Sequence, residues 1–194
     1  MESSNRADYR QKAILRAAIK LLQNGQADDV SMSELALQTG LSRPAIYQYF
    51  SSRQHVLAEL VINEMADLSN EIDRLVGLFE DPLEQVRVWI HYSLAHLASE
   101  EHVAIRKIST DVLPDSMRGE LRAMHGYVMT SLINPLAELG VADPGALCGM
   151  IYGSISAAAK RIEEGASFVE ESNALETFVV SGVESSISEA RGGL

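Results

Sequence analysis

Residues 39–54 read TGLSRPAIYQYFSSRQ and gather several side chains that can bind nucleic acids. An arginine can bind O6 and N7 of guanine with two hydrogen bonds, and a glutamine can bind N6 and N7 of adenine in the same way. Tyrosine hydroxyls and the N-terminus of a helix suit phosphate oxygens. The stretch therefore carries recognition chemistry, provided that the backbone presents these side chains to solvent.

A helical projection at 100° per residue divides residues 43–50 into two faces. The apolar face holds Ala45, Ile46, Tyr49 and Phe50. The opposite face holds Arg43, Pro44, Tyr47 and Gln48. We predict that the first face is core and that Arg43 and Gln48 of the second read bases. The alternative is that the tyrosines complete a small core and that the polar side chains only meet water.

Turn and cap residues around this stretch predict two short helices in tandem. Ser31 and Glu34 form a capping-box pattern, so a helix is expected to begin there. Gly40 ends it, because glycine adopts a positive φ without a Cβ clash. Ser42 can cap the next helix, and Pro44 is tolerated in its first turn. Two short helices joined by a glycine turn are a helix-turn-helix.

Helical spacing of apolar residues continues along the chain, without sustained strand-like alternation. The chain is therefore predicted to be all-α: an N-terminal three-helix bundle with the helix-turn-helix, linked by a fourth helix to a larger helical domain. The fourth helix is expected to open with the capping residues 51–54. Later helices are expected at residues 82–99, 101–111, 116–139, 144–163 and 170–189.

The first helix is expected to end near Gly25 and carries a row of cations on one face. Lys12, Arg16 and Lys20 recur at four-residue spacing, which places them in line. This row is either an ordinary solvated face or an edge that contacts phosphates.

Charge is distributed unevenly along the 194 residues, whose net charge is −11. Residues 1–60 hold seven lysines or arginines and six acids, a balance of +1, so the remainder carries −12. A small N-terminal module can therefore approach phosphates, whereas the acidic remainder would be repelled by them.

Other composition signals exclude several classes of protein. The single cysteine, Cys148, can form neither an intrachain disulfide nor a thiolate metal site, and it is expected to be a core thiol. The longest uncharged run, residues 144–159, is shorter than the ~20 residues that span a bilayer. Charged residues interrupt the start of the chain, so no signal peptide is expected and the predicted location is cytoplasmic.

The stretch from Ile14 to Leu60 resembles the TetR/AcrR family of ligand-responsive bacterial transcription factors. The resemblance rests on the apolar first helix, Gly25 and the segment MSELALQTGLSRPAIYQYFSSRQHVL. The family commonly has lysine where this chain has Arg53, and the charge is kept. The resemblance implies DNA contacts from Ser33, Ser42, Arg43, Pro44, Ala45, Tyr47, Gln48, Tyr49 and Arg53.

For the later residues the resemblance implies only a helical domain that binds an effector and dimerises. Two helices there carry stripes that suit an adaptable apolar pocket, one aromatic and one rich in methionine. The predicted ligand-binding residues are Trp89, Tyr92, His96, Met117, Leu121, Met124, His125 and Tyr152. The alternative is a plain hydrophobic core, with His96 as a hydrogen-bonded core histidine.

Small residues recur at every fourth position of the predicted helix 144–163. An interior glycine costs a helix about 1 kcal/mol relative to alanine, which suggests that another backbone comes very close. We predict a homodimer interface, with packing inside one subunit as the alternative. The predicted interface residues are Gly145, Gly149, Gly153, Ala157, Leu175, Phe178, Val179, Gly182 and Val183.

No catalytic signature occurs in the sequence: it has no G-x-S-x-G elbow and no phosphate-binding glycine loop. We therefore expect neither an enzyme nor a cofactor or metal. The predicted function is a ligand-responsive regulator, a repressor that binds palindromic double-stranded operator DNA as a homodimer and is released by a small, largely apolar effector. The predicted domains are residues 1–52 for DNA binding and 53–194 for effector binding and dimerisation, with 53–76 as the linking helix. The alternatives are a small-molecule binding protein without functional DNA binding and an all-α enzyme that uses His96.

Overall fold

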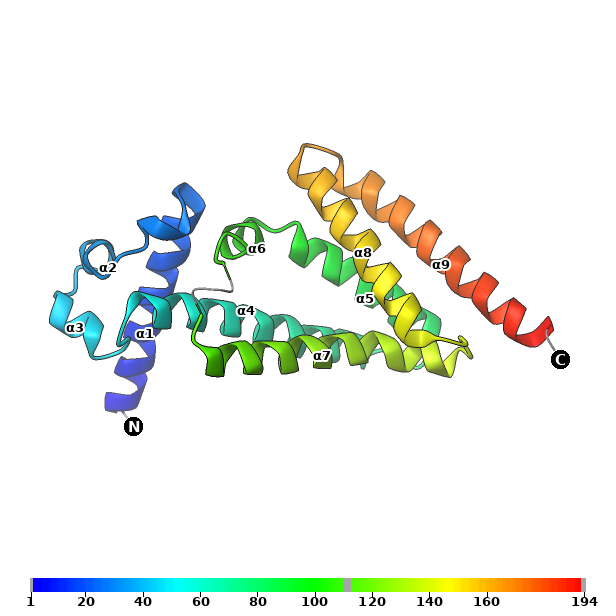
Figure 1. Cartoon of the computed structure of the whole chain (residues 1–194), viewed down its shortest axis with the longest axis horizontal. Helices are drawn as coiled ribbons and strands as arrows, with labels where there is room; N and C mark the ends of the chain where they lie inside the picture. The colour runs from blue at the N-terminus through cyan, green and yellow to red at the C-terminus, as the bar shows by residue number, and fades with distance from the viewer. Residues whose placement is uncertain (1, 110–112, 193–194) are drawn as a thin grey trace. The chain divides into compact units, whose positions relative to one another are not determined.

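A computed structural model describes residues 2–109 and 113–192, and all regular elements within these ranges are helical (Figure 1). The all-α prediction is thereby confirmed. In chain order the elements are α1 (Glu2–Asn24), the 3₁₀ turn η1 (Ala27–Asp29), α2 (Met32–Thr39), α3 (Arg43–Tyr47), α4 (Arg53–Val76), α5 (Pro82–Leu97), α6 (Glu100–Ile105), α7 (Asp115–Glu138), α8 (Pro144–Glu163) and α9 (Phe168–Gly192).

The ends of most helices agree with the predicted ranges, and α6 is the clearest exception. The sequence predicted a helix over 101–111, but α6 ends at Ile105. The backbone N–H groups of Lys107 and Ile108 bond to carbonyl oxygens three residues back, at 3.2 and 2.9 Å, so the helix closes in a tight turn. Positions 110–111 of the prediction lie outside the described residues.

The chain divides into two compact units. Unit 1 comprises the residues up to Met65 together with 100–122, and unit 2 comprises 66–99 together with 123–194. These spatial units differ from the predicted functional domains, 1–52 and 53–194, which stay a prediction.

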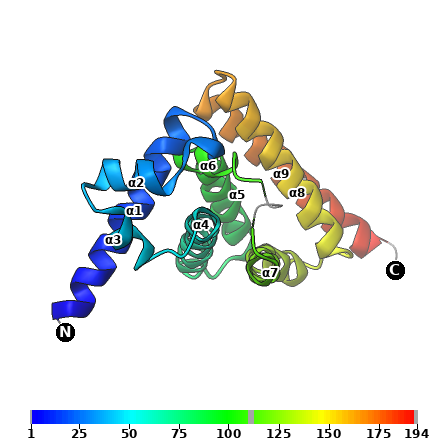
Figure 2. The ribbon, with the colours of Figure 1, turned by 60° about the vertical axis from the view of Figure 1, so that its left-hand side comes forward.

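Unit 1 is built around α1, which packs against α2 and α6, while α2 packs against α3 (Figure 2). Its core includes the fully buried side chains of Ile14, Leu35, Ile46 and Phe50. Lys107, just after α6, donates through Nζ to the carbonyl oxygens of Leu22 and Gly25, at 2.7 and 2.9 Å. These bonds satisfy carbonyl groups at the end of α1 and hold the α6 region on unit 1.

Unit 2 is built around α5, α8 and α9, which pack against one another in pairs. The ribbons of α8 and α9 run side by side, joined by the turn 164–167 (Figures 1 and 2). Gly165 in this turn has φ +105°, a conformation that residues with a Cβ rarely adopt. The buried side chains of Ile90, Ile155 and Val183 belong to its core. Among the described helices, none has a stretch long and apolar enough to cross a membrane.

Candidate nucleic-acid interface

The predicted helix-turn-helix forms from α2, α3 and the glycine turn between them. Ser31 Oγ accepts from the N–H of Glu34 at 3.1 Å and begins α2. Gly40 ends α2 with φ +68°, and Ser42 Oγ then accepts from the N–H of Ala45 at 3.3 Å and begins α3. The capping box is only half formed. Ser31 caps the helix, whereas the Glu34 carboxylate accepts from the side chain of Gln38 at 3.4 Å.

The two faces predicted for residues 43–50 are confirmed by the burial of their side chains. Ile46 and Phe50 are fully buried, and Tyr49 is half-buried against the unit 1 core. On the other face, Arg43, Pro44, Tyr47 and Gln48 are exposed. Within the part of the chain that the structure describes, Arg43 has no ion-pair partner. The outer face of α3 therefore offers a free guanidinium, a carboxamide and a phenol.

The other residues with predicted DNA contacts differ in accessibility. Ser33 in α2 is exposed, and Ser42 is exposed although its hydroxyl already caps α3. Ala45 is half-buried. None of these observations tests a contact with DNA, so the set stays a prediction.

Arg53 has a role that the sequence did not reveal. Its Nε donates to the carbonyl oxygen of Val30 at 2.8 Å, and one terminal nitrogen donates to Ala27 O at 2.5 Å and to the Asp28 carboxylate at 2.9 Å. These donors tie the start of α4 to the loop before α2. The predicted DNA contact of Arg53 would therefore have to compete with bonds that hold unit 1 together.

The residue that caps α4 differs from the one at which the predicted capping pattern begins. Ser52 caps this helix, accepting from the N–H of His55 at 3.1 Å, although the pattern began at Ser51. The N–H of Ser51 instead donates to Nδ1 of His55 at 3.2 Å. The His55 ring meets Phe50 edge-on, with ring centroids 5.4 Å apart, so this short network fixes the exit from α3.

The cation row of α1 is exposed, as both of its interpretations require. Arg16 and Lys20 border a depression of about 260 Å³, whose other lining residues are Ala13, Ala17, Gln38 and Thr39. Gln38 and Thr39 are uncharged, so the charges that border this depression come from α1.

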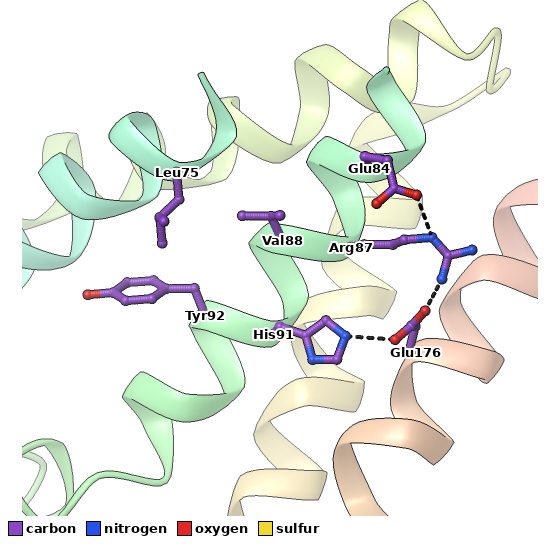
Figure 3. A pocket seen from close by; sticks show the side chains of 7 residues that line it. All are labelled: Leu75, Glu84, Arg87, Val88, His91, Tyr92 and Glu176. Carbon is purple, nitrogen blue, oxygen red and sulfur yellow. Dashed lines mark hydrogen bonds and ion pairs between the residues drawn. The ribbon is translucent and has the colours of Figure 1, made fainter. Parts of the chain in front are cut away.

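Unit 2 contains a groove of about 510 Å³ whose lining the sequence had not predicted, apart from Tyr92 (Figure 3). We call it the α5 groove, and it is lined by Leu75, Glu84, Arg87, Val88, His91, Tyr92 and Glu176. The α5 residues among them recur three or four positions apart, a spacing visible in the sequence. The contribution of Glu176 from α9 depends on tertiary structure and has no sequence signal.

The predicted ligand-binding residues are not gathered at one place within either unit. Trp89 is buried in unit 2, and its indole N–H donates to Ser131 Oγ at 2.9 Å, so it is a core residue. Met117 and Leu121 pack against the core of unit 1. In unit 2, Tyr92 stacks on His96 with ring centroids 6.4 Å apart.

The remaining three predicted ligand residues lie on α7 and α8. Met124 is half-buried, and the exposed His125 meets the half-buried Tyr152 edge-on with ring centroids 5.7 Å apart. Their contact with a ligand stays a prediction.

The predicted dimer residues separate into an open face and a buried one. Gly145, Gly149, Gly153 and Ala157 are exposed, as is Phe178 on α9, whereas Gly182 is half-buried. A Cβ added at Gly149 or Gly153 would meet no atom of the described chain within 4 Å, so close packing inside the subunit does not explain these glycines. Leu175, Val179 and Val183 are 6%, 3% and 0% exposed, so they pack inside unit 2 and offer little surface to a partner. The predicted interface stays a prediction.

Comparison with known proteins identifies the class of the N-terminal segment. Residues 14–60 match the family described as bacterial regulatory proteins, tetR family. The transcriptional regulator EthR of Mycolicibacterium smegmatis is 31% identical over 110 residues, which are 56% of this chain and 50% of that protein. In proteins with a helix-turn-helix, the second helix of the motif typically lies in the major groove of DNA. Residues 14–60 therefore carry the sequence pattern of the tetR family of bacterial regulatory proteins.

Solved structures share the fold over most of the chain. The regulator FadR from Bacillus subtilis, in complex with stearoyl-CoA, has a TM-score of 0.73 at 19% identity and covers 90% of this chain and 98% of its own. AibR, in complex with isovaleryl coenzyme A and operator DNA, has a TM-score of 0.74 at 16% identity and covers 87% and 97%. By sequence, the chain spans about half the length of the first curated relatives that it matches.

Proposed function

We propose that this chain is a ligand-responsive transcriptional regulator that binds operator DNA through the exposed face of α3. One observation carries the proposal: Arg43, Tyr47 and Gln48 lie exposed on the short helix of a helix-turn-helix whose opposite face is anchored in the core. This face lies inside the segment that matches the family. The stability of α3 comes from Ile46 and Phe50, so the outer polar side chains are free for recognition.

The outer face of α3 matches the chemistry of a major groove. Arg43 is suited to a guanine and Gln48 to an adenine, each through two hydrogen bonds. Tyr47 is suited to a phosphate oxygen at the edge of the groove. A homodimer would place two copies of α3 in successive major grooves about 34 Å apart, which calls for a palindromic operator.

The exposed glycine face of α8 supports the homodimer. Gly149 and Gly153 leave a helix surface that no atom of the described chain covers, and Met150 and Phe178 are 67% and 66% exposed in the same unit. Exposed large apolar side chains and an uncovered helix surface are typical of an interface between subunits.

Effector control is the third part of the proposal. Two proteins with this fold have been solved in complex with stearoyl-CoA and with isovaleryl coenzyme A, which favours small molecules with apolar groups as the class of effector. The long α4, Arg53–Val76, begins in unit 1 and ends in unit 2, so it can convey effector binding to α3. We propose repression, with release from DNA when the effector binds.

A binding assay with a matched arginine variant tests the DNA part. Genomic fragments, including the DNA upstream of the chain's own gene, are selected for binding, and the affinity of the selected duplex is measured for wild type, Arg43→Ala and Arg122→Ala. Arg122 is also exposed but lies on α7. We expect a loss of about tenfold or more for Arg43→Ala and little change for Arg122→Ala, because one base-reading arginine contributes roughly 1–3 kcal/mol. If no fragment is bound, the alternative of a small-molecule binding protein without functional DNA binding is favoured.

A further inference from the structure

The α5 groove of unit 2 has two halves of different chemistry (Figure 3). The side chains of Leu75, Val88 and Tyr92 gather at one end and form an apolar surface with one aromatic ring. The side chains of Glu84, Arg87, His91 and Glu176 gather at the other end. A groove of about 510 Å³ is within the range of roughly 300–1,000 Å³ that is usual for sites that bind small molecules.

The polar half is a connected network with an excess of negative charge. Arg87 pairs with Glu176 and, through Nε at 3.3 Å, with Glu84. His91 Nε2 lies 2.7 Å from the Glu176 carboxylate, and its Nδ1 lies 2.8 Å from the Ser172 hydroxyl. One guanidinium therefore faces two carboxylates, and the network keeps a net negative charge while the imidazole is neutral.

The imidazole of His91 is neutral under ordinary conditions. Burial lowers the pKa of His91 below 6.5, and the charge of Arg87 lowers this pKa further. The Glu84 carboxylate is the most available of the negative groups, because it is 47% exposed and its pair with Arg87 is the longer one. A ligand can therefore reach a carboxylate without first breaking the contact between Arg87 and Glu176.

The apolar half of the groove also lies near negative charges. Burial raises the pKa of the Tyr92 phenol, and the negative charges of Glu71 and Asp67 raise it further, against a lowering effect of Arg74. The ring is thus uncharged and lies in an acidic part of the unit. A neutral tyrosine face attracts cations, most strongly where water is partly excluded.

We propose that the α5 groove is a binding site for an amphipathic monocation, whose apolar body lies on Leu75, Val88 and Tyr92 and whose cationic head lies at Glu84 and Glu176. An anionic ligand would meet both carboxylates, and a neutral one would leave the excess charge without a partner. The proposal concerns small-molecule binding, so it does not depend on whether α3 binds DNA.

Titration calorimetry with three probes that share a decyl chain tests the proposal on the whole protein without DNA. The probes are decyltrimethylammonium, decyl maltoside and decyl sulfate, each kept below its micelle concentration. We expect the cation to bind most tightly and the sulfate most weakly. Equal affinities for the three probes, or tightest binding of decyl sulfate, would overturn the proposal.

Charge-neutralising variants locate the site. Glu84→Gln and Glu176→Gln are each expected to weaken the binding of decyltrimethylammonium by about two- to fivefold, the scale of a partly exposed charge interaction. Glu170→Gln makes the same charge change at an exposed position of α9 outside the groove and is expected to bind as wild type does.

Two further readouts separate loss of the site from loss of the fold. Glu84→Gln keeps the contacts of Glu176 with Arg87 and His91, so it remains informative if Glu176→Gln is unstable. Val88→Asp, at the apolar end, is expected to abolish binding of the decyl chain whatever its head group. Unchanged cation affinity in both Glu84→Gln and Val88→Asp would show that the probe binds elsewhere and would refute the proposal.

Discussion

At the scale of single residues, Arg43 and Arg53 show how position decides what a guanidinium does. Arg43 is exposed on α3 with no partner in the described chain, whereas Arg53 donates to two backbone carbonyl oxygens and the Asp28 carboxylate. A charged donor that satisfies backbone carbonyls stabilises the fold, because its removal leaves those carbonyls without a partner. The two arginines, alike in the sequence, should therefore have separable effects.

The first prediction compares these two arginines by stability. Arg53→Ala is expected to lower the free energy of unfolding by about 2 kcal/mol, and Arg53→Lys by less, because lysine keeps the charge and at least one bond. Arg43→Ala is expected to change it by less than about 0.5 kcal/mol. Urea denaturation followed by circular dichroism measures all three variants. Equal destabilisation by Arg43→Ala and Arg53→Ala would show that the exposed face of α3 is structural after all.

The second prediction concerns pH and His91. Because the pKa of His91 is lower in the folded chain than the ordinary 6.5, the unfolded chain takes up the proton more readily. His91 therefore contributes to stability above pH 6.5, and this contribution is lost as the pH falls through the lowered folded value. His91→Gln should flatten the loss of stability that begins as the pH falls below 6.5.

Urea titrations at several pH values measure this effect. His125→Gln, at an exposed position outside the α5 groove, is the control. A His91→Gln variant with the same pH dependence as wild type would contradict the assignment of this titration to His91.

At the scale of helices, the N-terminal half of the chain was predictable because its signals are local. Ser31, Gly40 and Ser42 act through bonds or dihedrals within a few residues, so the sequence alone indicates where α2 and α3 begin and end. The two faces of α3 follow from its helical period. The structural role of Arg53 was not predictable from local patterns, because its carbonyl partners lie more than 20 residues earlier in the chain.

The later helices show why the candidate pocket was less predictable. The aromatic stripe of α5 and the methionine stripe of α7 are both present, but Met117 and Leu121 pack against the core of unit 1 and Trp89 lies in the core of unit 2. A stripe reveals which residues share a face and not which neighbour covers that face. Glu176 joins the α5 groove from α9, a contact that no local pattern encodes.

The third prediction belongs to α8 and tests the proposed dimer. Gly149→Ala and Gly153→Ala each add a methyl group where the chain itself has no atom within 4 Å. On a free surface alanine would stabilise the helix by up to about 1 kcal/mol. At an interface of closely packed backbones it would separate the subunits, and we expect the double variant to weaken dimerisation by about tenfold or more.

Sedimentation analysis over a range of concentrations measures the dimerisation. Gly126→Ala is the matched control, because this exposed glycine of α7 also has no atom within 4 Å of an added Cβ. A double variant that is as dimeric as wild type and more stable would place the interface elsewhere.

At the scale of the whole molecule, the uneven charge is consistent with the proposed division of labour. The first 60 residues carry a balance of +1 and include the exposed face of α3, whereas the later residues carry −12. The acidic later residues disfavour non-specific contact with phosphates, so the proposed DNA binding would depend on the face of α3. If effector and operator are coupled, each must weaken the other by the same factor.

The proposed function requires two copies of α3 to lie in successive major grooves of an operator. Methylation interference at guanine N7, a major-groove atom, tests it most directly on the duplex selected by the wild-type protein. We predict two clusters of interfering guanines, about one helical turn apart and symmetric about a centre, and loss of both clusters in Arg43→Ala. A selected duplex with a single cluster, or with two clusters that persist at unchanged affinity in Arg43→Ala, would show that α3 does not bind DNA in this way.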